Sequence, residues 1–322
     1  MRPIIPPVTA EELKNELTPD KLVRTTNFGD NEIYIITNED SPNVMMEIGR
    51  LRELTFRAAG GGTGKSVDID RFDVATDGSA YKQLVLWNPH EEEIIGGYRF
   101  LFMKDLVKDG KGQINTAFSE LFKVEDEFVE NYLPYCIELG RSFIQPAYQS
   151  AKYSRKSMYA LDNLWDGLGA LIVMYPEMKY FIGKITMYAD YNPLARDLIQ
   201  YFFQKYFKDE KRLLVPYEPI KINTDIDYLA SIIGNDSYVA DYHALNKKVR
   251  SLGENIPPLF NSYMNISSTM KVFGTSINPF FGNVEETAII ITIDDIYDKK
   301  KARHVNSYIE YLKHAKSQRP DS

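Results

Sequence analysis

Residues 135–165, YCIELGRSFIQPAYQSAKYSRKSMYALDNLW, contain in succession a strand, a turn, a basic loop and the start of a helix. The strand-like run carries two charges, Glu138 and Arg141, and the turn follows at Gln145-Pro146. A helix start presents unpaired backbone N–H groups, which bind anions. The stretch is therefore typical of a site for a phosphate-bearing ligand. The alternative is an edge strand followed by a solvated loop.

Composition limits the class of protein. The 322 residues suffice for one large domain or two ordinary ones. Cys136, the single cysteine, excludes an intramolecular disulfide framework. A net charge of -7 argues against a nucleic-acid partner. The N-terminal stretch lacks the apolar core of a signal peptide, and no run approaches the roughly 20 apolar residues of a membrane span, so we expect a cytoplasmic protein.

Hydrophobic periodicity predicts a mixed α/β (α+β) chain in which a sheet is flanked by helices. Thr9, with Glu12 three residues later, is expected to cap a first helix. The predicted strands are 32–37, 83–87, 93–102, 135–144, 180–187 and 286–296, and the longer helices are 43–59, 161–175 and 193–207.

The domain organisation expected is one main domain after a short N-terminal part. Residues 1–40 form an arm with the first helix and strand, and residues 41–322 form the domain itself. The more polar segment at about 208–251 is expected to be a helical insertion, and about 313–322 a solvated tail. The unbroken apolar run within 286–296 predicts a strand buried on both faces at the centre of a covered sheet.

The glycine-rich run at 60–66, GGGTGKS, superficially matches a phosphate-binding P-loop. Ala59 stands where the pattern requires glycine, the run follows a helix rather than a strand, and VDIDRFD after it is unsuited to a helix. We therefore reject nucleotide binding here. Four glycines in five residues instead predict a flexible lid or hinge.

The order of the elements resembles the GNAT-type acyltransferase fold. More narrowly, it resembles the branch that uses acyl carrier protein: ornithine lipid N-acyltransferases, hemolysin-like acyltransferases and acyl-homoserine-lactone synthases. The resemblance runs from about Asn43 to Ile296. It rests on LRELTF (51–56), DRFD (70–73), GGYRF (96–100), ELGRSFIQPAY (138–148) and the long stretch 164–202.

This resemblance implies a splayed central sheet with the donor thioester between its strands. Glu138 would accept the proton of the acceptor's ammonium group, unless it forms a buried ion pair with Arg141 or Arg99. Arg141 would face the reaction, and a backbone N–H near Ser142 would polarise the thioester carbonyl.

Two further groups of residues are expected at the site. Substrate-binding residues at the rim of the acceptor site are Arg52, Phe56, Asp70, Asp73 and Arg99. Asp70 and Asp73 are expected to pair with Arg52 or Arg99 and to order the lid segment, and a purely structural network is the alternative. The family's glycine-rich phosphate loop is replaced by AKYSRKS, so we expect Lys152, Arg155 and Lys156 to contact the donor phosphate or the carrier protein directly. A solvated basic loop is the alternative.

The function implied is transfer of a long (3-hydroxy)acyl chain from acyl carrier protein to a small amino acid, glycine or ornithine, in aminolipid biosynthesis. Acyl carrier protein or coenzyme A would carry the co-substrate, and no further cofactor or metal is expected. Peripheral contact with the inner membrane is a further expectation. The alternatives are a coenzyme A-dependent GNAT enzyme acting on a soluble amine and a non-catalytic GNAT-like binding protein.

Overall fold

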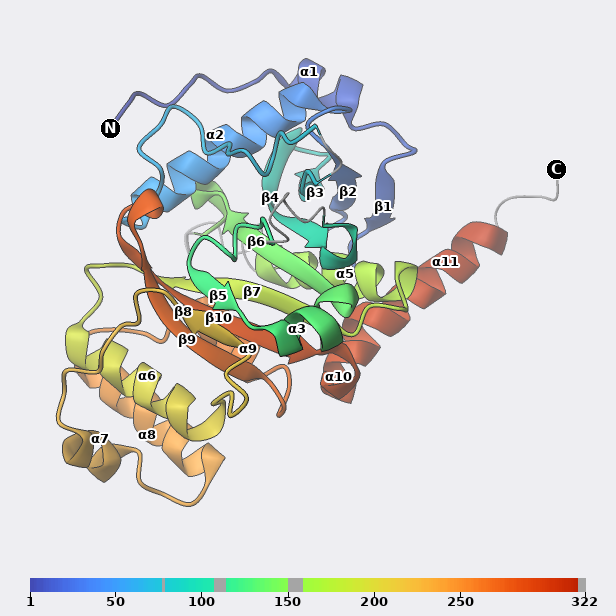
Figure 1. The fold of residues 1–322 in the computed structure, drawn as a ribbon. Helices are drawn as coiled ribbons and strands as arrows, with labels where there is room; N and C mark the ends of the chain where they lie inside the picture. Colours follow the sequence, from blue (N-terminus) through green and yellow to red (C-terminus); the bar gives the residue numbers. More distant parts are fainter. Residues whose placement is uncertain (77–78, 107–113, 150–158, 318–322) are drawn as a thin grey trace.

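The computed structural model describes residues 1–76, 79–106, 114–149 and 159–317, and helices cover both faces of its main sheet (Figure 1). The strand order is β1-β2-β3-β4-β6-β7-β10-β9, and only β6 and β7 run parallel to each other. This confirms the expected GNAT-like mixed sheet. The strands are β1 (Leu22–Thr25), β2 (Glu32–Ile36), β3 (Lys82–Asn88), β4 (Glu93–Phe102), β6 (Cys136–Ile144), β7 (Tyr180–Met187), β9 (Lys271–Asn278) and β10 (Val284–Thr292), and β5 (Phe122–Val124) pairs with β8 (Leu214–Pro216) in a second small sheet.

Several helices begin at a residue whose side chain caps them. Thr9 and Glu12 form the predicted capping box, and the side chain of Asn192 caps α6. The helices are α1 (Ala10–Glu16), α2 (Pro42–Ala58), α3 (Asp126–Asn131), α5 (Ala160–Met174), α6 (Pro193–Tyr206), α7 (Ile226–Ile232), α8 (Tyr238–Ser251), α9 (Pro258–Met264), α10 (Asp298–Lys301) and α11 (Ser307–Ser317). No helix in the described part of the chain is long and apolar enough to cross a bilayer.

Alternating side chains of the sheet divide the core into two layers. Ile33 and Leu84 belong to the cluster that includes α5 and α6, whereas Tyr34 and Val85 belong to the cluster that includes α2. This alternation follows from the two-residue period of a strand. The sheet therefore separates an α2 side from an α5 side.

The last strand differs in part from the prediction. β10 ends at Thr292 because Ile293–Asp295 turns into a 3₁₀ helix, and it lies next to the edge strand β9 rather than at the centre. Both of its faces are covered as expected, since Ile289 packs in the α5–α6 cluster and Ile290 in the cluster around β5 and β8.

The glycine-rich run at 60–66 is anchored to α2, contrary to the expectation of a flexible flap. The carboxylate of Glu53 accepts hydrogen bonds from the backbone N–H groups of Thr63 (3.0 Å) and Gly64 (2.8 Å). Arg57 pairs with the same carboxylate at 2.6 Å. Buried acceptors of this kind hold a loop in one conformation.

The expected segments join the main body of the fold. β1 and β2, from residues 1–40, extend the same sheet as the later strands. Within 208–251, Leu229 and Leu245 belong to the same hydrophobic cluster as α6, and Figure 1 shows α6, α7 and α8 grouped together. Residues 313–317 of the expected tail continue α11.

The C-terminal segment packs closely on α5 at a glycine. A β-carbon at Gly169 would lie 2.3 Å from the carbonyl oxygen of His304, which belongs to a π-helical turn between α10 and α11. Nearby, Nδ1 of His304 lies 2.8 Å from the buried carboxylate of Asp166 on α5. Gly169 therefore sets the distance between α5 and the C-terminal segment.

We predict that Gly169→Ala lowers the free energy of unfolding by about 1–3 kcal/mol, because the added methyl group forces the two backbones apart. Helix propensity alone favours alanine by about 1 kcal/mol, so a stabilised variant would contradict the prediction. Chemical denaturation measures the change. Met174→Ala, at an exposed position on the same helix, is the control and is expected to change it by less than about 0.5 kcal/mol.

Candidate active site

The parallel strands β6 and β7 part after four residue pairs. Their pairing joins Cys136–Leu139 to Tyr180–Gly183 and ends there. β6 nevertheless stays paired with β4 as far as Ile144, and β7 stays paired with β10 as far as Met187. The sheet is therefore open between Gly140–Ile144 of β6 and the end of β7, and backbone groups that face this gap have no ladder partner.

Arg141 lies in the gap with a left-handed backbone, φ 51°. The register between β4 and β6 shifts at this point, which is a β-bulge. Bulges redirect side chains, and a left-handed backbone is costly for a residue with a β-carbon. The Arg141 guanidinium lies 4.2 Å from the centre of the Phe281 ring and 2.9 Å from the Asp68 carboxylate.

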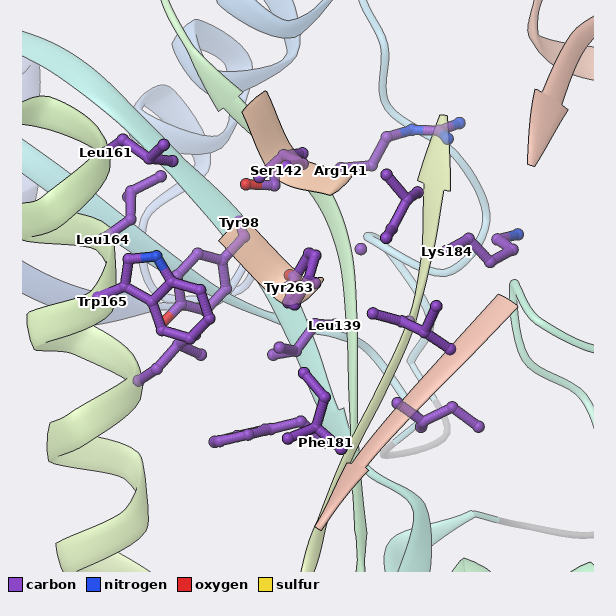
Figure 2. A pocket seen from close by; sticks show the side chains of 18 residues that line it. Tyr98, Leu139, Arg141, Ser142, Leu161, Leu164, Trp165, Phe181, Lys184 and Tyr263 are labelled. Atoms are coloured by element: carbon purple, nitrogen blue, oxygen red, sulfur yellow. The ribbon is translucent and has the colours of Figure 1, made fainter. Parts of the chain in front are cut away.

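A cavity of about 670 Å³ lies on the α5 side of the gap, and we call it the apolar hollow (Figure 2). One wall is the first half of α5, including Leu161, Leu164 and Trp165. The hydroxyl of Tyr98 is buried at this hollow and has no hydrogen-bond partner among the described residues. Its lining fits a largely apolar ligand.

A second cavity of about 530 Å³ lies on the α2 side, and we call it the polar hollow. It is lined by the charged residues Glu138, Arg99 and Glu286 and by the rings of Phe56 and Phe281. Both hollows share lining residues at the gap, so they meet there. The shared residues are Leu139, Gly140, Arg141, Ser142, Lys184 and Leu259.

Glu138 is buried in the polar hollow, and it forms no ion pair with any of the described residues. Its side chain is 2% exposed, and Oε2 has no hydrogen bond within the described residues. Burial raises the pKa of Glu138, although hydrogen bonding with Tyr81 opposes the rise. The ion-pair alternative is not found in the described part of the chain, because Arg99 and Arg141 pair with aspartates. A buried carboxylate with a raised pKa is suited to act as a general base.

Arg99 is fixed by a largely buried network of charges. Its guanidinium lies 2.7 Å from Asp70 and 3.2 Å from Asp73. Arg52 contacts Asp73 at 3.2 Å and Gln83 at 2.5 Å. Burial favours the neutral form of Asp73, but Arg99 and Arg52 outweigh it and hold the pKa of Asp73 well below its usual value. The network positions Arg99 at the edge of the polar hollow.

Lys184 supplies a further cation on the β7 side of the gap. Its Nζ atom lies 3.0 Å from the Glu286 carboxylate and donates to the carbonyl oxygen of Ala117 at 2.6 Å. The pKa of Glu286 is lowered because Lys184 and then Arg141 outweigh the effect of burial. Cations from both separated strands thus flank the gap.

The structure brings together five of the predicted site residues at the two hollows: Phe56, Arg99, Glu138, Arg141 and Ser142. Arg52 and Asp73 were expected at the rim of the acceptor site, but both are fully buried behind Arg99 and line neither hollow. They are therefore not placed to contact substrate. Asp70 lies in the same network with its side chain 25% exposed.

Three predicted residues, Lys152, Arg155 and Lys156, lie outside the described residues. Sequence reasoning missed Lys184 and Glu286, although a charge inside an otherwise apolar strand, as in YFIGKITM, is the same signal that indicated Arg99.

A mixed sheet whose parallel central pair parts between two hollows defines the GNAT class of acyltransferases. Residues 51–158 match the family described as acetyltransferase (GNAT) domain. The glycine N(alpha)-acyltransferase of Phocaeicola vulgatus is 52% identical over 310 residues, which cover 96% of this chain and 94% of the relative. That of Bacteroides thetaiotaomicron is also 52% identical, with coverage of 96% and 91%. The chain therefore belongs to the GNAT-type N-acyltransferase family of these relatives and is an acyltransferase.

One solved structure resembles the chain more distantly. It is an N-acyl amino acid synthase from uncultured soil microbes, with a TM-score of 0.41 and 12% identity, covering 83% of this chain and 93% of that one.

We predict that Arg99→Met destabilises the protein by about 3–5 kcal/mol at neutral pH, because it leaves buried carboxylates without their cation. The lowered pKa of Asp73 means that its ion pairs stabilise the fold above its unfolded pKa and that this stabilisation is lost as pH falls through the folded value. The difference in the free energy of unfolding between variant and wild type should therefore be smaller at acidic pH.

Urea denaturation at neutral and acidic pH measures both effects. Arg71→Met is the matched control, since Arg71 is exposed and pairs with Glu120 at 3.0 Å, and its effect is expected to stay below about 1 kcal/mol. Equal effects of the two substitutions would contradict the role of the buried network.

Proposed function

We propose that this acyltransferase moves a long acyl chain from the thioester of acyl carrier protein to the amine of glycine, producing an N-acyl amino acid for aminolipid biosynthesis. The observation that carries the proposal is the gap between β6 and β7, where the apolar and polar hollows meet at shared residues. A donor and an acceptor can approach such a gap from opposite faces of the sheet. Positioning of this kind contributes roughly 7–11 kcal/mol to the lowering of a bimolecular barrier.

The donor occupies the α5 side in this proposal. Its acyl chain lies in the apolar hollow, and its thioester carbonyl lies in the gap. Backbone N–H groups near Ser142 that face the gap, where β6 has no ladder partner on its β7 side, stabilise negative charge on the carbonyl oxygen. A hydroxyl on the chain, as in a 3-hydroxyacyl group, would find a partner in Tyr98.

The acceptor occupies the α2 side. Its amine lies at Glu138, and its carboxylate lies between Arg141 and Lys184, the cations at the two sides of the gap. The names of the two bacterial relatives support glycine as this acceptor, because each covers nearly the whole chain at 52% identity.

The reaction then follows from these positions. Glu138 accepts one proton from the ammonium group and passes it to solvent. The free amine attacks the thioester carbonyl, forming the C–N bond and an oxyanion. Collapse of this intermediate breaks the C–S bond, and the nitrogen's second proton neutralises the departing thiolate. The products are the amide and the free thiol of the carrier.

We predict that Glu138→Gln lowers kcat by about 10²–10⁴-fold with both substrates saturating. Glu138 acts only when ionised, and its pKa is raised, so the wild-type rate should fall as pH decreases through that raised value. The variant should lack this acidic limb. Its unfolding midpoint is not expected to fall, because the substitution removes a buried charge. Glu130→Gln, an exposed carboxylate on α3, is the control, and a near-normal rate for Glu138→Gln would disprove the general-base role.

The substrates are tested with purified enzyme and with cells. We expect turnover of palmitoyl-acyl carrier protein with glycine, faster than with palmitoyl-coenzyme A or with ornithine. Overexpression in a host without aminolipids should yield a new N-acyl glycine in the lipid extract. A preference for coenzyme A or ornithine would correct the donor or acceptor, and the absence of amide from every pair would refute the proposed reaction.

A further inference from the structure

A third cavity continues from the apolar hollow along α5. It lies between α5 and the C-terminal segment, where Ile172 and Val305 line it. We call it the distal hollow. Three residues line both the apolar and the distal hollow: Trp165, Leu168 and Phe181.

The two hollows follow successive turns of one helix. The apolar hollow is lined from Leu161 to Leu168, and the distal hollow from Trp165 to Ile172. From Leu161 to Ile172 the axis of α5 rises by about 16 Å, at 1.5 Å per residue. The cavities therefore lie end to end, and the gap between β6 and β7 is at the near end.

The lining of the distal hollow fits an alkyl chain. Apart from His304 and two lysines, its residues are hydrophobic or glycine. His304 already has its Nδ1 at 2.8 Å from Asp166, and Lys300 and Lys301 are half-buried, so their methylene stems can cover apolar surface while their ammonium groups reach water. A hydrocarbon chain that enters from the apolar hollow would therefore contact mostly apolar side chains.

We infer that Trp165, Leu168 and Phe181 form a partition that sets the acyl chain length, and that the distal hollow is space which opens to longer chains when the partition is reduced. This inference rests on the proposed function, since it assigns the apolar hollow to the acyl chain. Trp165 is the largest member and is half-buried, with its ring 5.8 Å from that of Tyr263. Removal of its indole joins the two hollows without touching Glu138 or the gap.

The test measures kcat/KM for octanoyl thioesters, for palmitoyl thioesters, and for thioesters that exceed palmitoyl by two carbons at a time. Each is measured with wild type and with Trp165→Ala. We expect the variant to raise the ratio of kcat/KM for the longest chains to kcat/KM for octanoyl by about tenfold or more, since each added methylene in an apolar pocket changes discrimination by about that factor. The ratio is measured within one preparation, so it does not depend on how much of the variant folds. Phe181→Leu reduces the partition from the β7 side and should shift the ratio in the same direction.

Ile172→Trp is the matched control because it fills the distal hollow alone. It should leave octanoyl transfer unchanged in the wild-type background and abolish the gain for long chains in the Trp165→Ala background. An unchanged ratio in both Trp165→Ala and Phe181→Leu would overturn the partition, as would a gain that persists when Ile172→Trp is added. These results are read against wild-type transfer of palmitoyl groups to glycine, whose absence would count against the proposed function instead.

Discussion

The parallel pairing of β6 and β7 is short, and the rest of the site depends on where it ends. Each strand keeps its outer antiparallel neighbour beyond that point, so neither can bend back to close the sheet. Gly183 stands at the last pair, where a β-carbon would lie 2.9 Å from the carbonyl oxygen of Leu139. The opening is consequently a rigid feature of the sheet. The residues on its two sides are held in place by the hydrogen bonds of β6 to β4 and of β7 to β10.

Ion pairs between arginines and buried aspartates stabilise the α2 side of this opening. Asp68 is fully buried with no hydrogen bond to its carboxylate among the described residues, and burial raises its pKa while Arg141 opposes the rise. Such a group is costly in isolation and acceptable only beside a cation. Arg99 and Arg141 therefore have two roles: each neutralises aspartates behind it and presents positive charge to the hollow in front. Glu286 pairs with Lys184, so among the described residues Glu138 is the buried carboxylate of the polar hollow that forms no ion pair.

Most of the fold was predictable from local patterns. The Thr9 capping box, the proline after Asn192 and the alternation in 83–102 specify their elements through contacts close in sequence. The strands β1, β5, β8 and β9 were not predicted. The first three have only three or four residues, which carry too little periodicity, and the pairing of all four is decided by distant neighbours. The anchoring of 60–66 was missed for a related reason, since Glu53 acts from another element.

The candidate site was predictable where charges interrupt apolar strands, as at Arg99, Glu138 and Arg141. Sequence alone did not distinguish residues that face the hollow from residues that support them, so Arg52 and Asp73 were placed at the rim although they lie behind it. Lys184 required knowledge of which strand stands opposite β6. The direction of a side chain at a bulge depends on backbone angles that no periodic pattern reveals.

Arg141 combines a functional position with an unfavourable backbone. Glycine adopts this left-handed φ without the steric cost, but it would leave the buried Asp68 carboxylate without its cation. Relief of the backbone strain at this position would therefore remove both an ion pair of the core and the charge that faces the gap.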